Sequence, residues 1–287
     1  MISITQKTLQ DLEFETILQT IASRCNTDIG ETKALAIAPI NDKTELLINL
    51  QQTAEYLSSF SNNNVIPNHG FENIDYELKF LAIEDSFLEV ASFKKISNLT
   101  ETAITLIQFL KKFETYYPNL FQRTTSIECV KLIIQRIDEV IDKFGIIKDN
   151  ASPDLIDIRR SINVVRGKIN QSFGMALSQY NSLGYLDDIK ETVVENRRVL
   201  AVLAMYRRKV KGSILGTSKT GSIAYIEPEA AQRYSRELNN LEFEEREEIM
   251  RILKRLTNDI RPFIETITAY QELLSDVDVI AAKAKYA

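Results

Sequence analysis

The residues of this chain best suited to chemistry gather in one basic stretch. Between Asn196 and Ile226 the sequence has no aspartate or glutamate and seven basic residues: Arg197, Arg198, Arg207, Arg208, Lys209, Lys211 and Lys219. The whole chain has the opposite balance, 40 acidic against 35 basic residues, so about four carboxylates would be expected in a stretch of this length. Arginine and lysine bind phosphate oxygens, arginine through paired N–H donors. A positive patch on a net-negative molecule therefore indicates a binding site for a polyanion.

The roles of the cations and of Tyr206 in this stretch stay open. The cations could form a solvated β surface that pairs with the glutamates following Pro228. Tyr206, next to Arg207, could stack on a base or a sugar, or it could pack within the fold.

Three short motifs resemble those of the serine acyl-enzymes that bind penicillin. They are Ser92–Lys95 (S-x-x-K), Ser161–Asn163 (S-x-N) and Lys219–Gly221 (K-T-G). The second motif is expected inside a long helix rather than in a loop, and the sequence has no export signal. Because degenerate motifs of this length arise often by chance, we predict no acyl-enzyme chemistry.

Other catalytic and metal-binding signatures are missing from the sequence. It has no G-x-x-x-x-G-K-[ST], no G-x-G-x-x-G and no H-E-x-x-H. The single histidine, His69, lies in a polar segment and is expected to be exposed or satisfied by a neighbour. Cys25 and Cys129 are too few for a disulfide framework, so buried reduced thiols in a cytoplasmic protein are expected. We predict no catalytic residue, no metal site and no cofactor in this chain.

The elements around the basic stretch are predicted to be mainly helical. Only nine glycines and six prolines occur among 287 residues. Within residues 1–150, apolar residues recur at helical spacing on two faces: Phe14, Ile17, Leu18 and Ile21 on one, and Leu46, Leu47, Leu50, Ala54, Leu57 and Phe60 on the other. No apolar run approaches the length of a membrane span, so no membrane is expected among its partners.

A long helix with a narrow apolar seam is predicted from Ser152 onward. Ser152, Pro153 and Asp154 form a strong helix start, with serine as N-cap and proline at the first helical position. The seam that follows is Leu155, Ile158, Ile162, Val165, Ile169, Phe173, Ala176 and Tyr180. Its spacing of three and four residues indicates a helix that needs one partner along its length.

The basic stretch itself has the period of β-strands. Four short β-like runs are separated by glycines: Thr192–Val194, Val199–Met205, Ser213–Leu215 and Ser222–Ile226. Helix resumes after Pro228. The simplest arrangement is an antiparallel pair of helices that bury each other's seams and carry a small β module at the far end.

In order and spacing, several segments resemble the MutS superfamily. The resemblance is to its bacterial branch that lacks the mismatch-recognition domain and is linked to suppression of recombination. The segments are Leu9–Phe14, Phe144–Leu155 with Ile158–Arg160, Glu195–Arg198, Tyr206–Arg207 with Gly212, Ser218 with Gly221, Tyr225–Pro228 and Ala282–Ala287. Two sites depart from that branch, which usually has His-Asp where this chain has Leu215–Gly216 and two asparagines where it has Ser235–Arg236.

The resemblance implies a fold in three parts. We expect a helical core at residues 1–150, two lever helices at 151–181 and 229–287, and a β-rich basic clamp at 182–228. It also implies a cytoplasmic, DNA-contacting and non-catalytic portion of a DNA-repair or recombination-control ATPase. The longer parent protein would be a homodimer that binds ATP and Mg²⁺, and it would also be a nuclease in some members, through domains beyond this chain.

Three classes of partner follow from these expectations. The first is double-stranded or branched DNA, contacted through its phosphates. The second is ribosomal RNA, because the same branch has been linked to the splitting of stalled ribosomes. The third is a protein gripped by a purely structural arm.

Overall fold

The computed structural model describes residues 5–287, and it is mainly α-helical with one small sheet of four antiparallel strands. This confirms the prediction of a mainly α-helical chain with a small β-rich part. Contacts group the described chain into two compact units. Unit 1 contains the residues up to Lys148 together with Leu253–Ala287, and unit 2 contains Asp149–Ile252. The predicted three-part division into core, lever and clamp stays a prediction.

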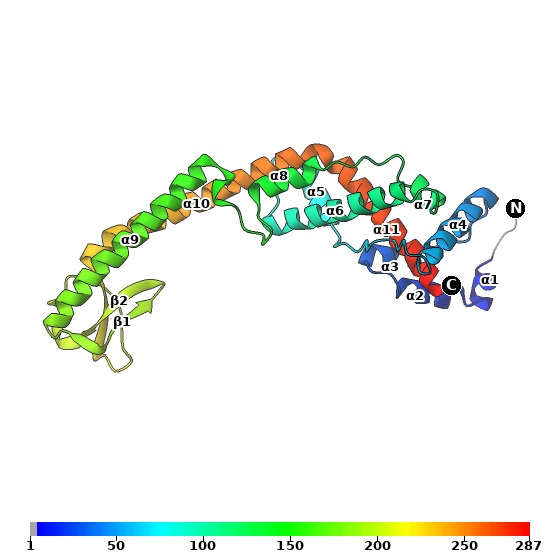
Figure 1. Cartoon of the computed structure of the whole chain (residues 1–287). Helices are drawn as coiled ribbons and strands as arrows, with labels where there is room; N and C mark the ends of the chain where they lie inside the picture. The colour runs from blue at the N-terminus through cyan, green and yellow to red at the C-terminus, as the bar shows by residue number, and fades with distance from the viewer. Residues whose placement is uncertain (1–4) are drawn as a thin grey trace. The chain divides into compact units, whose positions relative to one another are not determined.

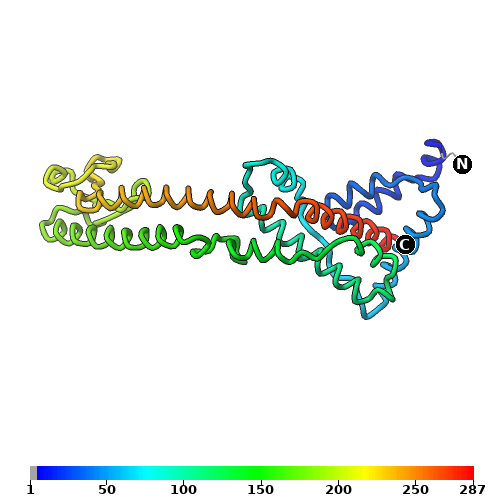
Figure 2. Tube along the Cα trace, turned by 90° about the horizontal axis from the view of Figure 1, so that it is seen from above, coloured from blue at the N-terminus to red at the C-terminus, as the bar shows by residue number. Residues whose placement is uncertain are grey.

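Unit 1 is built around its last helix, α11. Contacts join α11 to five other helices of the unit, and Figure 2 shows its red tube lying among them. From Gln271 to Ala282 the helix is buried all round except at two residues: Glu272 is exposed and Asp276 is half-buried. The helices of unit 1 are α1 (Gln6–Asp11), α2 (Phe14–Ala22), α3 (Asp28–Leu35), α4 (Lys43–Ser59), α5 (Asp75–Leu81), α6 (Val90–Lys112), α7 (Pro118–Gln122), α8 (Leu132–Val140), the end of α10 (Glu229–Ile260), the 3₁₀ turn η3 (Arg261–Phe263) and α11 (Ile264–Tyr286).

Helix α4 is oriented opposite to the expectation from its apolar pattern. Its buried side chains are Gln52, Tyr56 and Ser59. The predicted apolar face is exposed, with Leu50 at 58% and Phe60 at 49%. The polar face lies inward because it binds the start of α7 (described in the next paragraph), and periodicity alone cannot reveal such a partner.

The carboxylate of Glu55 fixes α4 against the N-terminus of α7. It accepts hydrogen bonds from the backbone N–H groups of Asn119 and Leu120, both at 2.9 Å. The amide of Gln52 donates to the carbonyl of Asn119 at 3.1 Å. A helix N-terminus has unsatisfied N–H donors and a positive dipole end, so a carboxylate stabilises it.

In unit 2, helix α9 (Pro153–Ser182) begins as the sequence predicts. The Ser152 hydroxyl accepts the Leu155 N–H at 3.1 Å, and Pro153 occupies the first turn. The seam residues Leu155, Ile162, Val165, Phe173, Ala176 and Tyr180 are buried, while Ile158 and Ile169 are half-buried. The predicted seam is confirmed.

The partner of α9 is the first part of α10, and the two helices run antiparallel. Ser152 donates to Glu248 at 2.7 Å, Arg159 to Glu245 at 2.8 Å, and Arg166 to Glu242 at 3.2 Å. The partner number falls as the α9 number rises, which defines the direction. Figure 1 shows the two helices side by side, with β1 and β2 near the last turns of α9. Glu245, in the middle of α10, is held by its ion pair with Arg159.

The sheet has the strand order β1-β2-β4-β3. Its strands are β1 (Leu186–Val194), β2 (Arg197–Leu203), β3 (Gly212–Thr217) and β4 (Ile223–Pro228). A two-residue turn joins β1 to β2, with Glu195 at φ 50° and Asn196 at φ 62°, both left-handed as this tight turn requires. One cluster of buried residues joins the sheet to α9: Phe173, Ala176 and Tyr180 of the helix with Leu200, Val202, Val210, Ala224 and Ile226.

The segment 204–211 crosses the sheet between β2 and β3. It starts beside the β3–β4 turn, where the Ala204 N–H donates to the Ser222 carbonyl at 2.9 Å. It ends where Gly212 pairs with Pro228, at the opposite end of β4. Val210 is 5% exposed and anchors the segment in the cluster that also holds α9. We call residues 204–211 the crossing segment.

Candidate nucleic-acid interface

The seven predicted cations do not form one equivalent set. Arg197 makes an ion pair of 3.1 Å with Glu227, whose side chain is 3% exposed. Arg198 pairs with Glu191 at 2.7 Å, and its guanidinium lies 4.4 Å from the ring centroid of Phe173. Arg197 thus links β2 to β4, and Arg198 links β2 to β1 and α9. Both side chains are half-exposed. Their charge is largely compensated within the fold.

The other five cations are exposed and lie on the crossing segment or the β3–β4 turn: Arg207, Arg208, Lys209, Lys211 and Lys219. Within residues 5–287, none of the five has a carboxylate at ion-pair distance. The hydrogen bond from Ala204 to Ser222 brings the start of the crossing segment next to the turn that carries Lys219. We call these five residues the basic surface.

The local backbone presents these side chains to solvent. The short 3₁₀ turn η2 (Ala204–Tyr206) is followed by a bond from the Arg207 N–H to the Ala204 carbonyl at 3.3 Å and one from the Lys209 N–H to the Tyr206 carbonyl at 2.8 Å. With Val210 buried beneath it, this compact loop directs its long basic side chains outward.

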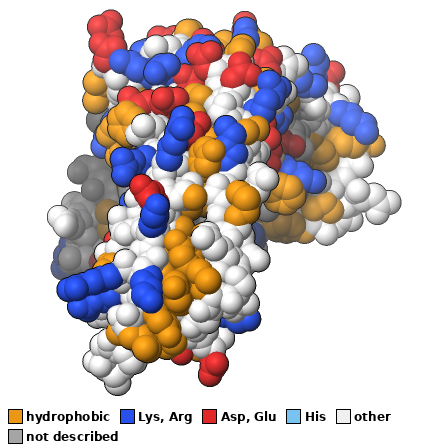
Figure 3. Space-filling view, turned by 90° about the vertical axis from the view of Figure 1, so that its left-hand side faces the viewer, with side chains coloured by type: hydrophobic (Ala, Val, Ile, Leu, Met, Phe, Trp, Pro, Cys, Tyr) orange, Lys and Arg blue, Asp and Glu red, His pale blue; other side chains and the backbone are white. Residues whose placement is uncertain are grey.

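Three acidic side chains of the sheet lie on its edge strand β1. Strand β1, at the far edge from β3, carries Asp187, Asp188 and Glu191. Of these three, Glu191 pairs with Arg198, whereas Arg197 pairs with Glu227 on β4. In the lower part of Figure 3, Lys and Arg side chains gather beside a strip of apolar side chains.

A stack of three tyrosines adjoins the basic surface. The ring centroids of Tyr185 and Tyr206 lie 4.5 Å apart at an interplanar angle of 21°, and those of Tyr180 and Tyr185 lie 6.3 Å apart at 22°. The Lys209 ammonium lies 5.7 Å from the Tyr185 centroid and 5.6 Å from that of Tyr206. Tyr206 packs within the fold, as one of the two interpretations held, and its half-buried ring also borders the basic surface.

The serine motifs do not have the surroundings of a nucleophile. The buried Ser92 hydroxyl donates to the Glu77 carboxylate at 3.0 Å. Ser161–Asn163 lies inside α9, as predicted, and Lys219–Gly221 lies in the β3–β4 turn rather than on a strand.

His69 is buried rather than exposed, at 2%. Its Nδ1 lies 3.2 Å from the Pro67 carbonyl, and its Nε2 lies 3.8 Å from a carboxylate oxygen of Asp278. Burial lowers the pKa of this imidazole, with the Pro67 carbonyl and Asp278 opposing that effect. The histidine is part of a buried polar cluster of unit 1.

The centre of that cluster is the fully buried carboxylate of Asp278. It accepts the backbone N–H groups of Asn26 and Thr27, both at 2.9 Å, and the Thr27 hydroxyl at 2.8 Å. A Cβ on Gly30 would lie 2.4 Å from this carboxylate, so the close approach requires glycine. This cluster was not predicted from the sequence, in which its only signals are a glycine inside α3 and an aspartate inside the apolar part of α11.

The cysteines differ from the expectation in one respect. Burial raises the pKa of the half-buried Cys25 thiol to about 12, with Asp278 adding to the effect. Cys129, expected to be buried, is exposed because it lies in the irregular segment before α8. Both thiols are free.

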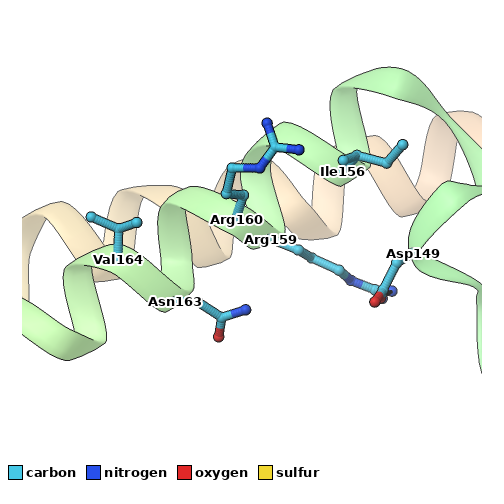
Figure 4. Close-up of a pocket in the computed structure, with 6 residues that line it drawn as sticks. All are labelled: Asp149, Ile156, Arg159, Arg160, Asn163 and Val164. Atoms are coloured by element: carbon cyan, nitrogen blue, oxygen red, sulfur yellow. Dashed lines mark hydrogen bonds and ion pairs between the residues drawn. The ribbon is translucent and has the colours of Figure 1, made fainter.

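A surface hollow of about 480 Å³ lies along the first turns of α9. Figure 4 shows Arg159 directed toward Asp149, with Arg160 and Asn163 projecting to different sides of the helix. Arg159 is engaged by Asp149 and Glu245, and Arg160 by Asp157 at 3.1 Å. Since these groups do not converge, the hollow carries no candidate chemistry.

Two other features are absent from the described residues. Among residues 5–287 no group of three or more His, Cys, Asp or Glu side chains could hold a metal ion. Over the same part of the chain, no helix combines the length and the apolar character needed to cross a membrane.

The chain was compared with proteins of known name and with protein families. No family model matches the chain. It is similar to the protein named Endonuclease MutS2 of Lacticaseibacillus casei, with 29% identity over 286 residues, and to those of Symbiobacterium thermophilum and Alkaliphilus oremlandii, each with 26% identity, over 280 and 284 residues. These matches cover 98–99% of the chain but only 35–36% of each relative. The chain thus spans about a third of the length of these relatives.

Proposed function

We propose that this chain is the DNA-contacting portion of a MutS-type protein and that it holds DNA through phosphate contacts from the basic surface. The observation that carries the proposal is the set of five exposed cations without a carboxylate partner in the described chain. Similarity to proteins named Endonuclease MutS2 over nearly the whole chain supports the nature of the ligand.

Charge explains how such a surface selects its ligand. The chain has a formal net charge of −5, so non-specific attraction of polyanions elsewhere on the molecule is weak. Each phosphate neutralised by a lysine or arginine releases condensed counterions, which makes binding salt-dependent and nearly independent of sequence. Arg197 and Arg198, also predicted as DNA-binding residues, contribute less in this proposal because Glu227 and Glu191 compensate them.

The antiparallel pair of α9 and α10 acts in this proposal as the lever, and the sheet with its crossing segment acts as the clamp. ATP binding and hydrolysis, with Mg²⁺, and any nuclease activity belong to parts of a longer protein that this chain does not include. Pairing of two such proteins would place two clamps around one duplex, and the movement of the levers would open and close them. No catalytic residue is assigned to this chain.

The experiment is a salt titration of DNA binding. In the test variant Arg207, Arg208, Lys209 and Lys211 are each changed to Gln, which keeps the apolar stems. If all four contact phosphates, the slope of log affinity against log salt should fall in magnitude by roughly 3–4 units, to the same extent on duplexes of unrelated sequence. Binding is measured by fluorescence anisotropy at several salt concentrations, with folding checked by circular dichroism.

The matched control removes the same charge from unit 1. The control uses four exposed lysines that make no ion pair within residues 5–287. Three lie in helices and one directly precedes α8: Lys43, Lys79, Lys111 and Lys131. Changing all four to Gln should leave the slope unchanged. Equal slopes for wild type, test and control would refute the proposal; binding to ribosomal subunits without binding to DNA would replace DNA by ribosomal RNA as the ligand.

A further inference from the structure

Unit 2 contains a pocket that phosphate contacts alone do not explain. It has a volume of about 580 Å³ and lies between the last turns of α9, the first residues of α10 and the crossing segment. The residues that give it chemical character are Gln179, Tyr180, Tyr185, Lys209, Lys211 and Glu229.

The aromatic side of the pocket is held in place by the fold. Tyr180 is 8% exposed and packs in the cluster that joins α9 to the sheet, with Tyr185 against it. The Tyr180 hydroxyl accepts the backbone N–H of Lys211 at 3.1 Å, which fixes the ring relative to the crossing segment. A rigid aromatic surface loses little conformational entropy when a planar ligand stacks on it.

The cationic side adjoins the aromatic side. The Lys209 ammonium lies 5.7 Å from the Tyr185 ring centroid. Both Lys209 and Lys211 are exposed, without an ion-pair partner in residues 5–287. A ligand that meets both surfaces must combine a π-face with an anionic group a few ångströms away.

The polar residues of the pocket restrict the kind of ligand further. Glu229 at the start of α10 lines the same pocket as the two lysines. A site for phosphate alone would gain nothing from a carboxylate, whereas a carboxylate or the Gln179 amide can accept a hydrogen bond from the exocyclic amino group of a base. In a paired duplex the faces of the bases are stacked on each other and their edges are paired, so neither is available.

We propose that this pocket binds one unpaired nucleotide of a DNA strand, with its base on the tyrosines and its phosphate at Lys209 and Lys211. The inference rests on the proposed function and specifies its substrate class. DNA with a bulge, flap, gap or junction would offer such a nucleotide next to the duplex that the basic surface holds. Stacking of one base should favour such DNA over a perfect duplex by roughly 5- to 150-fold.

The test uses 2-aminopurine, a fluorescent base whose emission is quenched by stacking. It is placed either as a single-nucleotide bulge or in a perfect duplex of the same sequence. The wild-type chain should bind the bulged DNA more tightly and quench its emission. Tyr185→Leu removes the aromatic wall, and Gln179→Trp fills the pocket from an exposed position of α9 without removing a cation.

Both variants should reduce the preference for the bulge to about one while leaving duplex affinity and its salt slope unchanged. Gln179→Trp keeps the test valid if Tyr185→Leu disturbs the packing of the sheet. Free dAMP should compete for the quenched state of the bulge in the wild type. If dAMP binds but the bulged base is never quenched, the pocket serves a free nucleotide and the proposal is wrong.

The two proposals fail in different ways. Duplex binding that depends on the four cations, without preference for the bulge or quenching, would overturn this inference and leave the proposed function standing. Absence of binding to either DNA would overturn both.

Discussion

Burial of a charge in the seam of α9 should destabilise unit 2 strongly, and Ile162 is the position at which the size of this effect can be worked out. Ile162 is 4% exposed, and it lies between Arg159 and Arg166, whose partners on α10 are Glu245 and Glu242. Ile162→Glu would remove the apolar contact and place a carboxylate against a region of α10 that already carries two. We expect a loss of about 3–5 kcal/mol, from lost burial and from the unpaired charge.

The assay is thermal and urea unfolding followed by circular dichroism. For a protein of this size, a loss of that magnitude corresponds to a fall in Tm of roughly 6–20 °C. The control is Val164→Glu, two residues away on the same helix and 53% exposed, which should change stability by less than about 0.5 kcal/mol. Ile162→Lys should be less harmful than Ile162→Glu, because its charge is opposite to that of Glu242 and Glu245.

The reasoning would be refuted if Ile162→Glu and Val164→Glu unfolded at the same midpoint. It would also fail in its electrostatic part if Ile162→Lys were the more destabilising of the two charged variants at this site.

Further predictions concern four single residues. Gly212→Ala should destabilise the sheet by about 2 kcal/mol or more, because a Cβ there would lie 2.1 Å from the Glu227 carbonyl oxygen; Gly167→Ala in α9, where nothing lies within 4 Å, should instead stabilise by about 0.5–1 kcal/mol in the same urea assay. The pKa of His69 is lowered in the folded state. Below about pH 6.5 the unfolded state therefore binds a proton more readily than the folded state, and stability decreases as the pH decreases. The urea midpoint should fall more between pH 7.5 and 5.5 in the wild type than in His69→Gln. Glu55→Gln should cost about 1–2 kcal/mol through weaker bonds to the α7 amides, measured by the urea midpoint.

The sequence predicts best those elements whose stability depends on one neighbour. The α9 seam is such a case, since each of its residues faces the same partner and the spacing of three and four follows directly. The four β-like runs likewise correspond to the four strands, because alternation and glycine breakers act over a few residues.

The failures involve partners that are remote in the chain. Helix α4 lies with its polar side inward because Glu55 binds amides 64 and 65 residues further on. His69 is buried against Asp278, an interaction that no local pattern signals. The basic stretch contains no acid in the sequence, but Arg197 and Arg198 at its start are compensated by carboxylates just outside it, Glu227 and Glu191.

The discontinuity of unit 1 has a consequence for the order of folding. Its helix α11 is separated from the N-terminal helices by the whole of unit 2, and the Thr27–Asp278 bond closes a span of 251 residues. During synthesis α2 and α3 emerge long before α11, which packs against their apolar side chains. Unit 2, which is continuous in sequence, can complete its contacts first. The N-terminal helices can contact one another as they emerge, but the apolar side chains that α11 covers stay exposed until the ribosome has released that helix.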